Sequence, residues 1–224
     1  MSILAAIGGF LTAAASVIGP ALSTAATFIA TKLPAILQTA SVIVGSITSI
    51  VTNVSKMLNI APEGEQPDEL GAKTLQEGTR PIKEGETTQE YLDYLRNEVT
   101  LDREKYEKMT AEQKLNCEII GDVMLAASIE ETTGVEIPPE FLVAAGKVQM
   151  GYQTVNALIN TFSDKGIDSL GDYTKYIEND MSEEDAIKVG GAVRNAISER
   201  SPDMTPEEIE AEVVAMKREY NKEN

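Results

Sequence analysis

The 224-residue sequence contains no histidine and no tryptophan, a single cysteine, and only four phenylalanines and seven tyrosines. Without histidine there is no histidine-activated nucleophile and no histidine-based zinc site. The single cysteine, Cys117, excludes a disulfide within the chain and a cysteine-rich metal centre. Cys117 precedes an apolar helical stretch, which favours a buried structural thiol over a nucleophile.

Charge is almost missing from the N-terminal part, where the first 60 residues carry only Lys32 and Lys56. All 36 Asp and Glu residues lie after Ala61 with the other 17 Lys and Arg, so residues 1–60 carry a net charge of +2 and the other 164 residues −19. A strongly acidic surface repels the phosphate backbone, so we expect no nucleic-acid partner. Any membrane contact would be hydrophobic and would come from residues 1–60.

The apolar N-terminus differs from a secretory signal. No Lys or Arg precedes Lys32, and the apolar stretch is longer than a signal sequence requires. We therefore expect these residues to remain in the protein. The compartment stays open, because one cysteine is compatible with a reducing or an oxidising environment.

Two long helices are expected in this N-terminal part. Residues 3–33 form the first, with a kink at Gly19-Pro20, and residues 35–58 form the second after Pro34. Apolar residues recur at alternating spacings of four and three, with a parallel series every seven residues, as in a coiled coil. The predicted apolar stripe comprises Ile3, Ile7, Phe10, Val17, Ile36, Leu37, Ile43, Val44, Ile47, Ile50, Val51, Val54, Met57 and Leu58. The opposite face of the second helix is polar but uncharged, with Gln38, Ser41, Thr48, Ser49, Thr52 and Ser55.

The rest of the chain divides into an arm and a helical body. Residues 61–86 are rich in proline, glycine and acids, which predicts an extended linker or arm. In residues 87–224 the caps and apolar spacings predict helices over 87–108, 110–133, 138–162, 182–199 and 205–221, with a short segment at 172–179. The predicted fold is all-α: an uncharged helical hairpin over residues 1–60, the arm, and an acidic helical bundle.

Carboxylates are the remaining candidates for chemistry. Glu130 and Glu131 could in principle pair as an acid and a base. The acids at 183–185 are explained by the favourable field at a helix N-terminus. The Asp164–Asp172 segment resembles a calcium loop, but Gly166 stands where that loop needs an oxygen ligand. We therefore predict no catalytic residue, no metal site and no cofactor, and a protein that is not an enzyme.

Three interpretations of the N-terminal helices compete. They are long enough to span a membrane, and their Ser/Thr face would then pack against neighbouring helices or line a lumen. Alternatively, they form a dry interface within a ring, tube or filament. In the third interpretation they are the core of a monomeric bundle, which we disfavour because a core helix usually keeps charged residues on its solvent side. In layout the chain resembles helical pore-forming toxins and ejected virion proteins, whose apolar hairpin is stored until release.

The first two interpretations share a prediction: a non-enzymatic, self-assembling helical component of a virion or injection/secretion-type particle. The hairpin would pack in a homo-oligomer and could insert in or perforate a membrane. The partners would be further copies, other subunits of the assembly and, on delivery, a lipid bilayer. A purely structural subunit without membrane activity and a secreted pore-forming toxin remain alternatives.

Overall fold

The computed structural model describes the backbone of residues 3–34 and 37–223, and their side chains apart from those of residues 3–14, 219 and 221–223. These described residues form eleven α-helices and no strand, so the all-α prediction is confirmed. The helices are α1 (Ile3–Lys32), α2 (Leu37–Met57), α3 (Pro67–Leu75), α4 (Thr88–Asn97), α5 (Arg103–Glu107), α6 (Ala111–Thr133), α7 (Pro139–Lys147), α8 (Tyr152–Asp164), α9 (Gly171–Glu178), α10 (Glu183–Arg200) and α11 (Pro206–Glu223).

The helix starts predicted from capping residues are confirmed in three places. Thr87 and Thr110 each form a capping box, in which the cap side chain and the residue three positions later satisfy each other's backbone N–H. The Ser182 hydroxyl accepts from the N–H of Asp185 at the start of α10. The predicted kink is also present, because Gly19 has a non-helical backbone with φ +79° inside α1.

Three predicted segments need correction. Part of the arm is helical: α3 begins at Pro67, whose missing N–H costs nothing there, and acids occupy its first turn. The helix predicted over 87–108 is divided into α4 and α5, because Val99 and Leu101 turn inward to become buried. The helix predicted over 138–162 is divided into α7 and α8 at Gln149, which has φ +49°.

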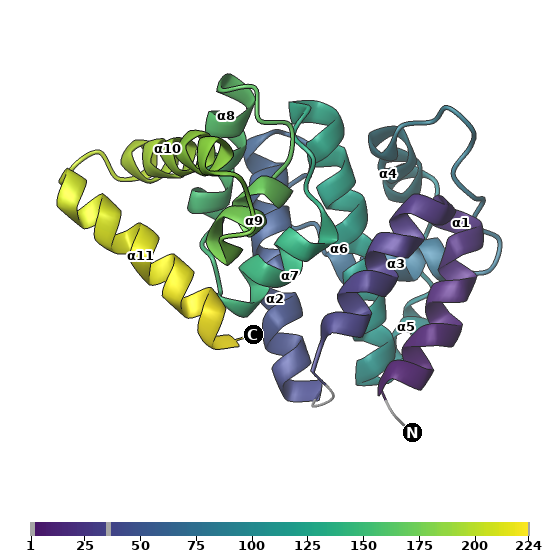
Figure 1. Ribbon diagram of the computed structural model, residues 1–224. Helices are drawn as coiled ribbons and strands as arrows, with labels where there is room; N and C mark the ends of the chain where they lie inside the picture. Colours follow the sequence, from purple (N-terminus) through teal and green to yellow (C-terminus); the bar gives the residue numbers. More distant parts are fainter. Residues whose placement is uncertain (1–2, 35–36, 224) are drawn as a thin grey trace.

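α6 is the central helix of the fold. It packs against α1, α2, α3 and α4, and these neighbours surround it (Figure 1). From Ile119 to Ala126 every residue is buried, so this part of the helix has no solvent face. A helix that is buried all round must find apolar partners on several sides, and α1 and α2 supply two of them.

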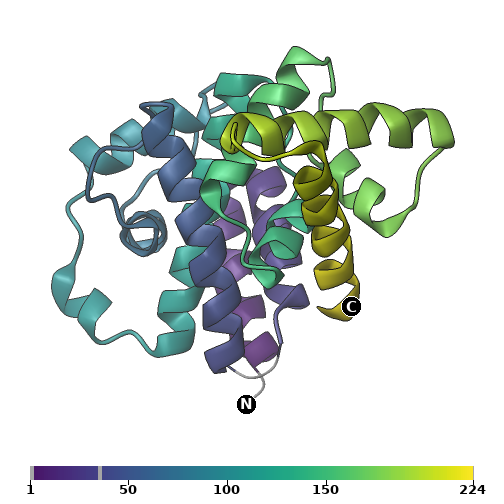
Figure 2. The same cartoon turned by 90° about the vertical axis from the view of Figure 1, so that its left-hand side faces the viewer.

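The N-terminal helices belong to the same hydrophobic core as the rest of the chain. Among the described residues, α1 and α2 make their main contacts with α6 and α7 rather than with each other, unlike the expected hairpin. Ile29 of α1, Ile47 of α2, Ile120 of α6 and Phe141 of α7 are all buried in one continuous cluster. Figure 2 shows α2 running along the body of the molecule. The packing of the described helices is compact.

The segment after α3 docks on its own chain. The N–H of Ile82 donates to the carbonyl of Val17 beside the α1 kink at 2.8 Å. Arg80 forms two hydrogen bonds with Glu86, at 2.8 and 2.6 Å, and its guanidinium lies 4.0 Å from the centre of the Tyr94 ring. These contacts hold a segment without regular structure against α1 and α4.

Candidate functional site

Most of the apolar stripe predicted in the second helix lies inside the protein. Its central six residues are at most 8% exposed: Ile43, Val44, Ile47, Ile50, Val51 and Val54. They pack against α6, α7 and α8. Gly146 of α7 allows a close approach, because a Cβ at that position would lie 2.8 Å from Ile47 Cγ1 and 2.9 Å from the Ile43 carbonyl oxygen. For these six residues the structure matches the interpretation as a core helix.

The remaining residues of the predicted stripe are placed differently. Val17, Leu37 and Leu58 are half-buried against the core, and Met57 is 52% exposed. The others fall outside the side chains that the structure describes: Ile3, Ile7, Phe10 and Ile36.

The solvent side of α2 is uncharged over most of its length. We call this surface the α2 outer face, and its exposed residues are Gln38, Thr39, Ser41, Val42, Gly45 and Ser49. Val42, which was not part of the predicted polar face, is 50% exposed near the centre of this surface. None of these exposed residues is charged, although the protein has a net charge of −17.

The exposed side of α1 beyond its kink has the same character. Thr24, Thr27 and Thr31 are exposed, and each hydroxyl donates at 2.8 Å to a backbone carbonyl three or four residues earlier in α1. Their donor hydrogens are therefore used within the helix, and methyl groups contribute to the surface. Lys32 is the one charged residue among the described exposed residues of α1.

Part of the predicted polar face of α2 points into the protein. Ser55 is fully buried, and neither its hydroxyl nor that of Thr52 has a hydrogen-bond partner among the described residues. Thr48 contacts two acids of α6: its Oγ1 lies 2.9 Å from Glu118 Oε1 and 2.8 Å from Asp122 Oδ2. Thr48, Thr52 and Ser55 of the predicted polar face are thus partly or fully buried, because heptad spacing alone cannot show how many neighbours surround a helix.

Asp122 and Glu118 form the most unusual electrostatic feature of the interior. Asp122 is 1% exposed, and burial raises its pKa well above the usual range, with the charge of Glu118 adding to the effect. Burial also raises the pKa of Glu118, and the hydrogen bond from Thr48 opposes both shifts. This cluster was not predicted. Its signal in the sequence was an aspartate inside the otherwise apolar stretch from Ile119 to Ala127.

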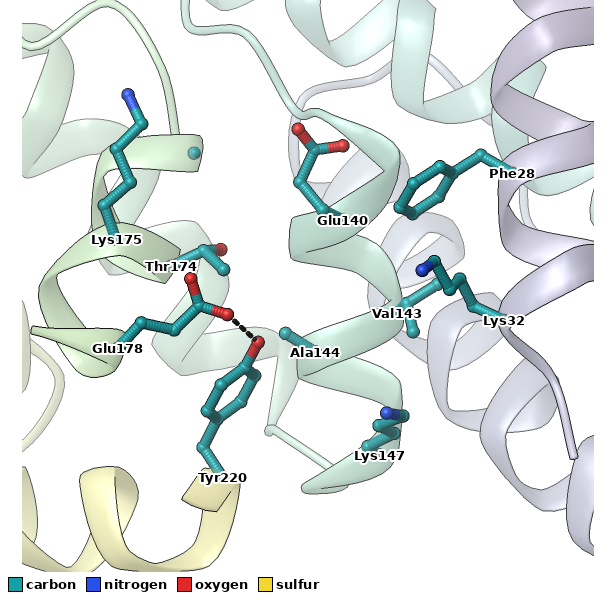
Figure 3. Close-up of a pocket in the computed structure, with 11 residues that line it drawn as sticks. Phe28, Lys32, Glu140, Val143, Ala144, Lys147, Thr174, Lys175, Glu178 and Tyr220 are labelled. Atoms are coloured by element: carbon teal, nitrogen blue, oxygen red, sulfur yellow. Dashed lines mark hydrogen bonds between the residues drawn. The ribbon is translucent and has the colours of Figure 1, made fainter. Parts of the chain in front are cut away.

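A pocket of about 350 Å³ opens where α1, α7, α9 and α11 converge (Figure 3). Its charged groups are largely engaged within the chain: Tyr220 donates to Glu178 at 2.6 Å, and Lys175 pairs with Asp172 at 2.9 Å. It is therefore a weak candidate for a ligand site. Its lining includes Phe28, Lys32, Val143, Lys175, Glu178 and Tyr220.

The acids considered as a catalytic pair have structural partners. Glu130 accepts from the N–H of Ile137 at 2.5 Å, and Glu131 accepts from the N–H of Thr88 at 2.8 Å. In the part of the chain that the structure describes, no group of three or more Cys, Asp or Glu side chains is arranged to hold a metal ion.

By length and composition, α2 could cross a membrane, and it is the one described helix with this property. The core helix of a soluble protein can have the same composition. In the structure the apolar side of α2 is covered by other helices of the chain.

Comparison with models of known protein families gave no match, and comparisons with curated proteins and with solved structures gave no significant match.

Proposed function

We propose that this protein is a non-enzymatic structural subunit that self-associates through the uncharged surface of its N-terminal helices, as part of a virion or injection-type particle. One observation carries the proposal. The α2 outer face and, apart from Lys32, the exposed side of α1 present uncharged side chains, whereas residues 61–224 have a net charge of −19.

Electrostatics favours a second copy of this chain as the partner that binds this uncharged surface. Two copies with a net charge of −17 repel each other over most of their surfaces. Repulsion is weakest where the uncharged faces meet, and small residues let two helices approach closely. Val42 supplies an apolar contact near the centre of the α2 outer face. A contact between copies at this face leaves the core stripe undisturbed.

The positions of the candidate acids support a non-enzymatic role. Glu130 and Glu131 each accept hydrogen bonds from backbone N–H groups, which explains their presence without catalysis. Burial raises the pKa of the Cys117 thiol to about 12, which is the opposite of what a nucleophile requires.

The test is the mass distribution of the full-length protein over a range of concentrations, measured by sedimentation velocity. Val42→Asp places a charge on the α2 outer face, and Ile187→Asp is the matched control, because Ile187 is 71% exposed on α10. We expect wild type and Ile187→Asp to form the same oligomers and Val42→Asp to remain monomeric. Monomeric wild type, or unchanged oligomers of Val42→Asp, would contradict the proposal.

Membrane insertion by α2 is a second candidate, and the observation that favours it is the span-length apolar composition of this helix. It requires α2 to leave its place against α6, α7 and α8. The test is dye release from neutral-lipid vesicles by the full chain, because electrostatic attraction to anionic lipid is unfavourable here. Leakage by wild type that is lost when α2 is tethered to α6 by an engineered disulfide would support insertion. If the vesicles stay intact, membrane insertion is contradicted and the structural role is the candidate that remains.

A further inference from the structure

One hydroxyl group lies between two carboxyl groups in the interface between α2 and α6. Thr48 Oγ1 is within hydrogen-bond distance of both Glu118 Oε1 (2.9 Å) and Asp122 Oδ2 (2.8 Å). A threonine hydroxyl has a single hydrogen, so it can donate one full hydrogen bond or share that hydrogen in a weaker three-centre bond. A carboxyl that carries a proton can donate it to the hydroxyl oxygen, and both contacts are then full hydrogen bonds. The geometry therefore favours a bound proton in this group.

The groups around Glu118 and Asp122 do little to stabilise a negative charge on either carboxyl. Asp122 is 1% exposed, and its Oδ1 has no hydrogen-bond partner among the described residues. Glu118 lies one turn before it on the same helix, and Asp68 of α3 adds a third negative charge that acts on both. Like charges held close together in a buried site cannot all ionise without a large cost.

The cations of the helices packed on α6 are engaged elsewhere. Lys56 of α2 pairs with Glu63, and Lys73 of α3 donates to the Leu95 carbonyl. On α4, Arg96 pairs with two acids outside this group, and the ammonium of Lys32 on α1 lies over the Phe28 ring. The remaining neighbour, α8, contains one charged residue, the terminal Asp164.

We propose that Thr48, Glu118 and Asp122 form a proton-dependent contact, which we call the latch, that holds α2 against α6. Loss of the shared proton weakens this contact. This inference concerns the interior of a single chain and does not depend on the self-association proposed above. The two proposals concern the same helix, however. Opening the latch would expose apolar residues of α2 next to Thr48, such as Ile47 and Ile50.

The direction of the pH effect follows from the protonated state of the folded protein. Both acids have folded-state pKa values raised above their usual range, so the folded state binds protons that the unfolded state has released. Their contribution to stability is complete below the ordinary carboxyl pKa of about 4 and is lost as the pH rises through the raised folded-state values. The latch is therefore closed in acid and opens towards alkaline pH.

The test compares denaturant unfolding of wild type and Asp122→Asn at about pH 5 and about pH 9, because an amide of the same shape cannot ionise. Glu104→Gln is the control for charge alone, since the Glu104 side chain is 80% exposed. We expect the folding equilibrium constant of wild type and of the control to fall at least about tenfold more than that of Asp122→Asn, because each unit of raised pKa corresponds to a factor of ten. Equal pH dependence in all three proteins would overturn the proposal.

If Asp122→Asn does not fold, the proposal can be tested in the wild-type protein alone, by measuring amide hydrogen exchange at several pH values. After correction for the intrinsic pH dependence of exchange, the amides of α2 should lose protection as the pH rises, while those of α10 should not. A constant protection of α2 relative to α10 would overturn the latch. Repeating the measurement in Val42→Asp at low protein concentration separates the latch from self-association, because Thr48 and its partners are unchanged in that variant.

Discussion

Gly121 of α6 lies directly against the backbone of Pro67 in α3, so closely that a Cβ at Gly121 would come within 2.0 Å of the Pro67 carbonyl oxygen. The contact is reciprocal: a Cβ at Gly71 of α3 would come within 1.9 Å of the Cys117 carbonyl oxygen of α6. Glycine on both helices lets two backbones touch without side chains between them. This contact places α3 firmly in the core, although its sequence is typical of a linker.

Gly121→Ala should destabilise the protein by about 1–3 kcal/mol or more, because the new methyl group meets backbone atoms that cannot turn aside. Gly191→Ala is the control: Gly191 lies inside α10, where a Cβ would meet no atom within 4 Å, and alanine should stabilise that helix by about 0.5–1 kcal/mol. Denaturant unfolding measures both changes. Similar effects of the two substitutions would show that α3 does not contact α6 in this way.

The Cys117 thiol should react slowly in the native protein. It is fully buried, and burial raises its pKa to about 12, so very little thiolate is present near neutral pH. Reaction with an aromatic disulfide reagent near pH 8 should therefore wait for unfolding and become rapid in denaturant. Rapid modification of the folded chain would mean that α3 and α6 separate readily.

Arg80→Ala should release the segment between α3 and α4 without unfolding the core. Arg80 pairs with Glu86 through two hydrogen bonds and covers the Tyr94 ring, whereas Lys108 and Glu104 form a comparable pair that is exposed on both sides. Exposed pairs contribute about 0–1 kcal/mol. We therefore expect faster hydrogen exchange at Ile82 in Arg80→Ala and no change there in the control Lys108→Ala.

Ser55→Ala should stabilise the protein by about 1 kcal/mol, because it removes a buried hydroxyl that has no hydrogen-bond partner among the described residues and introduces a better helix former. Ser49→Ala, on the exposed side of the same helix, isolates the gain in helix propensity. If both variants were stabilised equally, the Ser55 hydroxyl would have a hydrogen-bond partner in the folded protein.

The local structure was largely predictable, but the number of neighbours around each helix was not. Caps such as Thr110 with Gln113 and breaks such as Gly19-Pro20 act over a few residues, so sequence patterns identify them. The division of the helices predicted over 87–108 and 138–162 depends on where Val99, Leu101 and Met150 find space in the core. Such long-range packing leaves little trace in local spacing.

The apolar stripe shows the same limit at the candidate site. Spacing identified the residues that α2 buries, including Ile47, but it could not distinguish burial between copies from burial within one chain. The decisive partner was α6, whose stretch from Ile119 to Ala126 is apolar on nearly all sides and therefore needs neighbours. The absence of charge on the outer side of α2 remains, and it is the feature that self-association would explain.

The most direct measurement is the labelling rate of a cysteine placed on the α2 outer face, which the buried Cys117 should not obscure. Ser41→Cys and the control Ile187→Cys would each be treated with a maleimide at high and at low protein concentration. If copies associate through α2, Ser41→Cys should be protected at high concentration and exposed on dilution, while Ile187→Cys should react rapidly at both. Equal rates for Ser41→Cys at the two concentrations, in samples that contain oligomers at the higher one, would contradict association through this face.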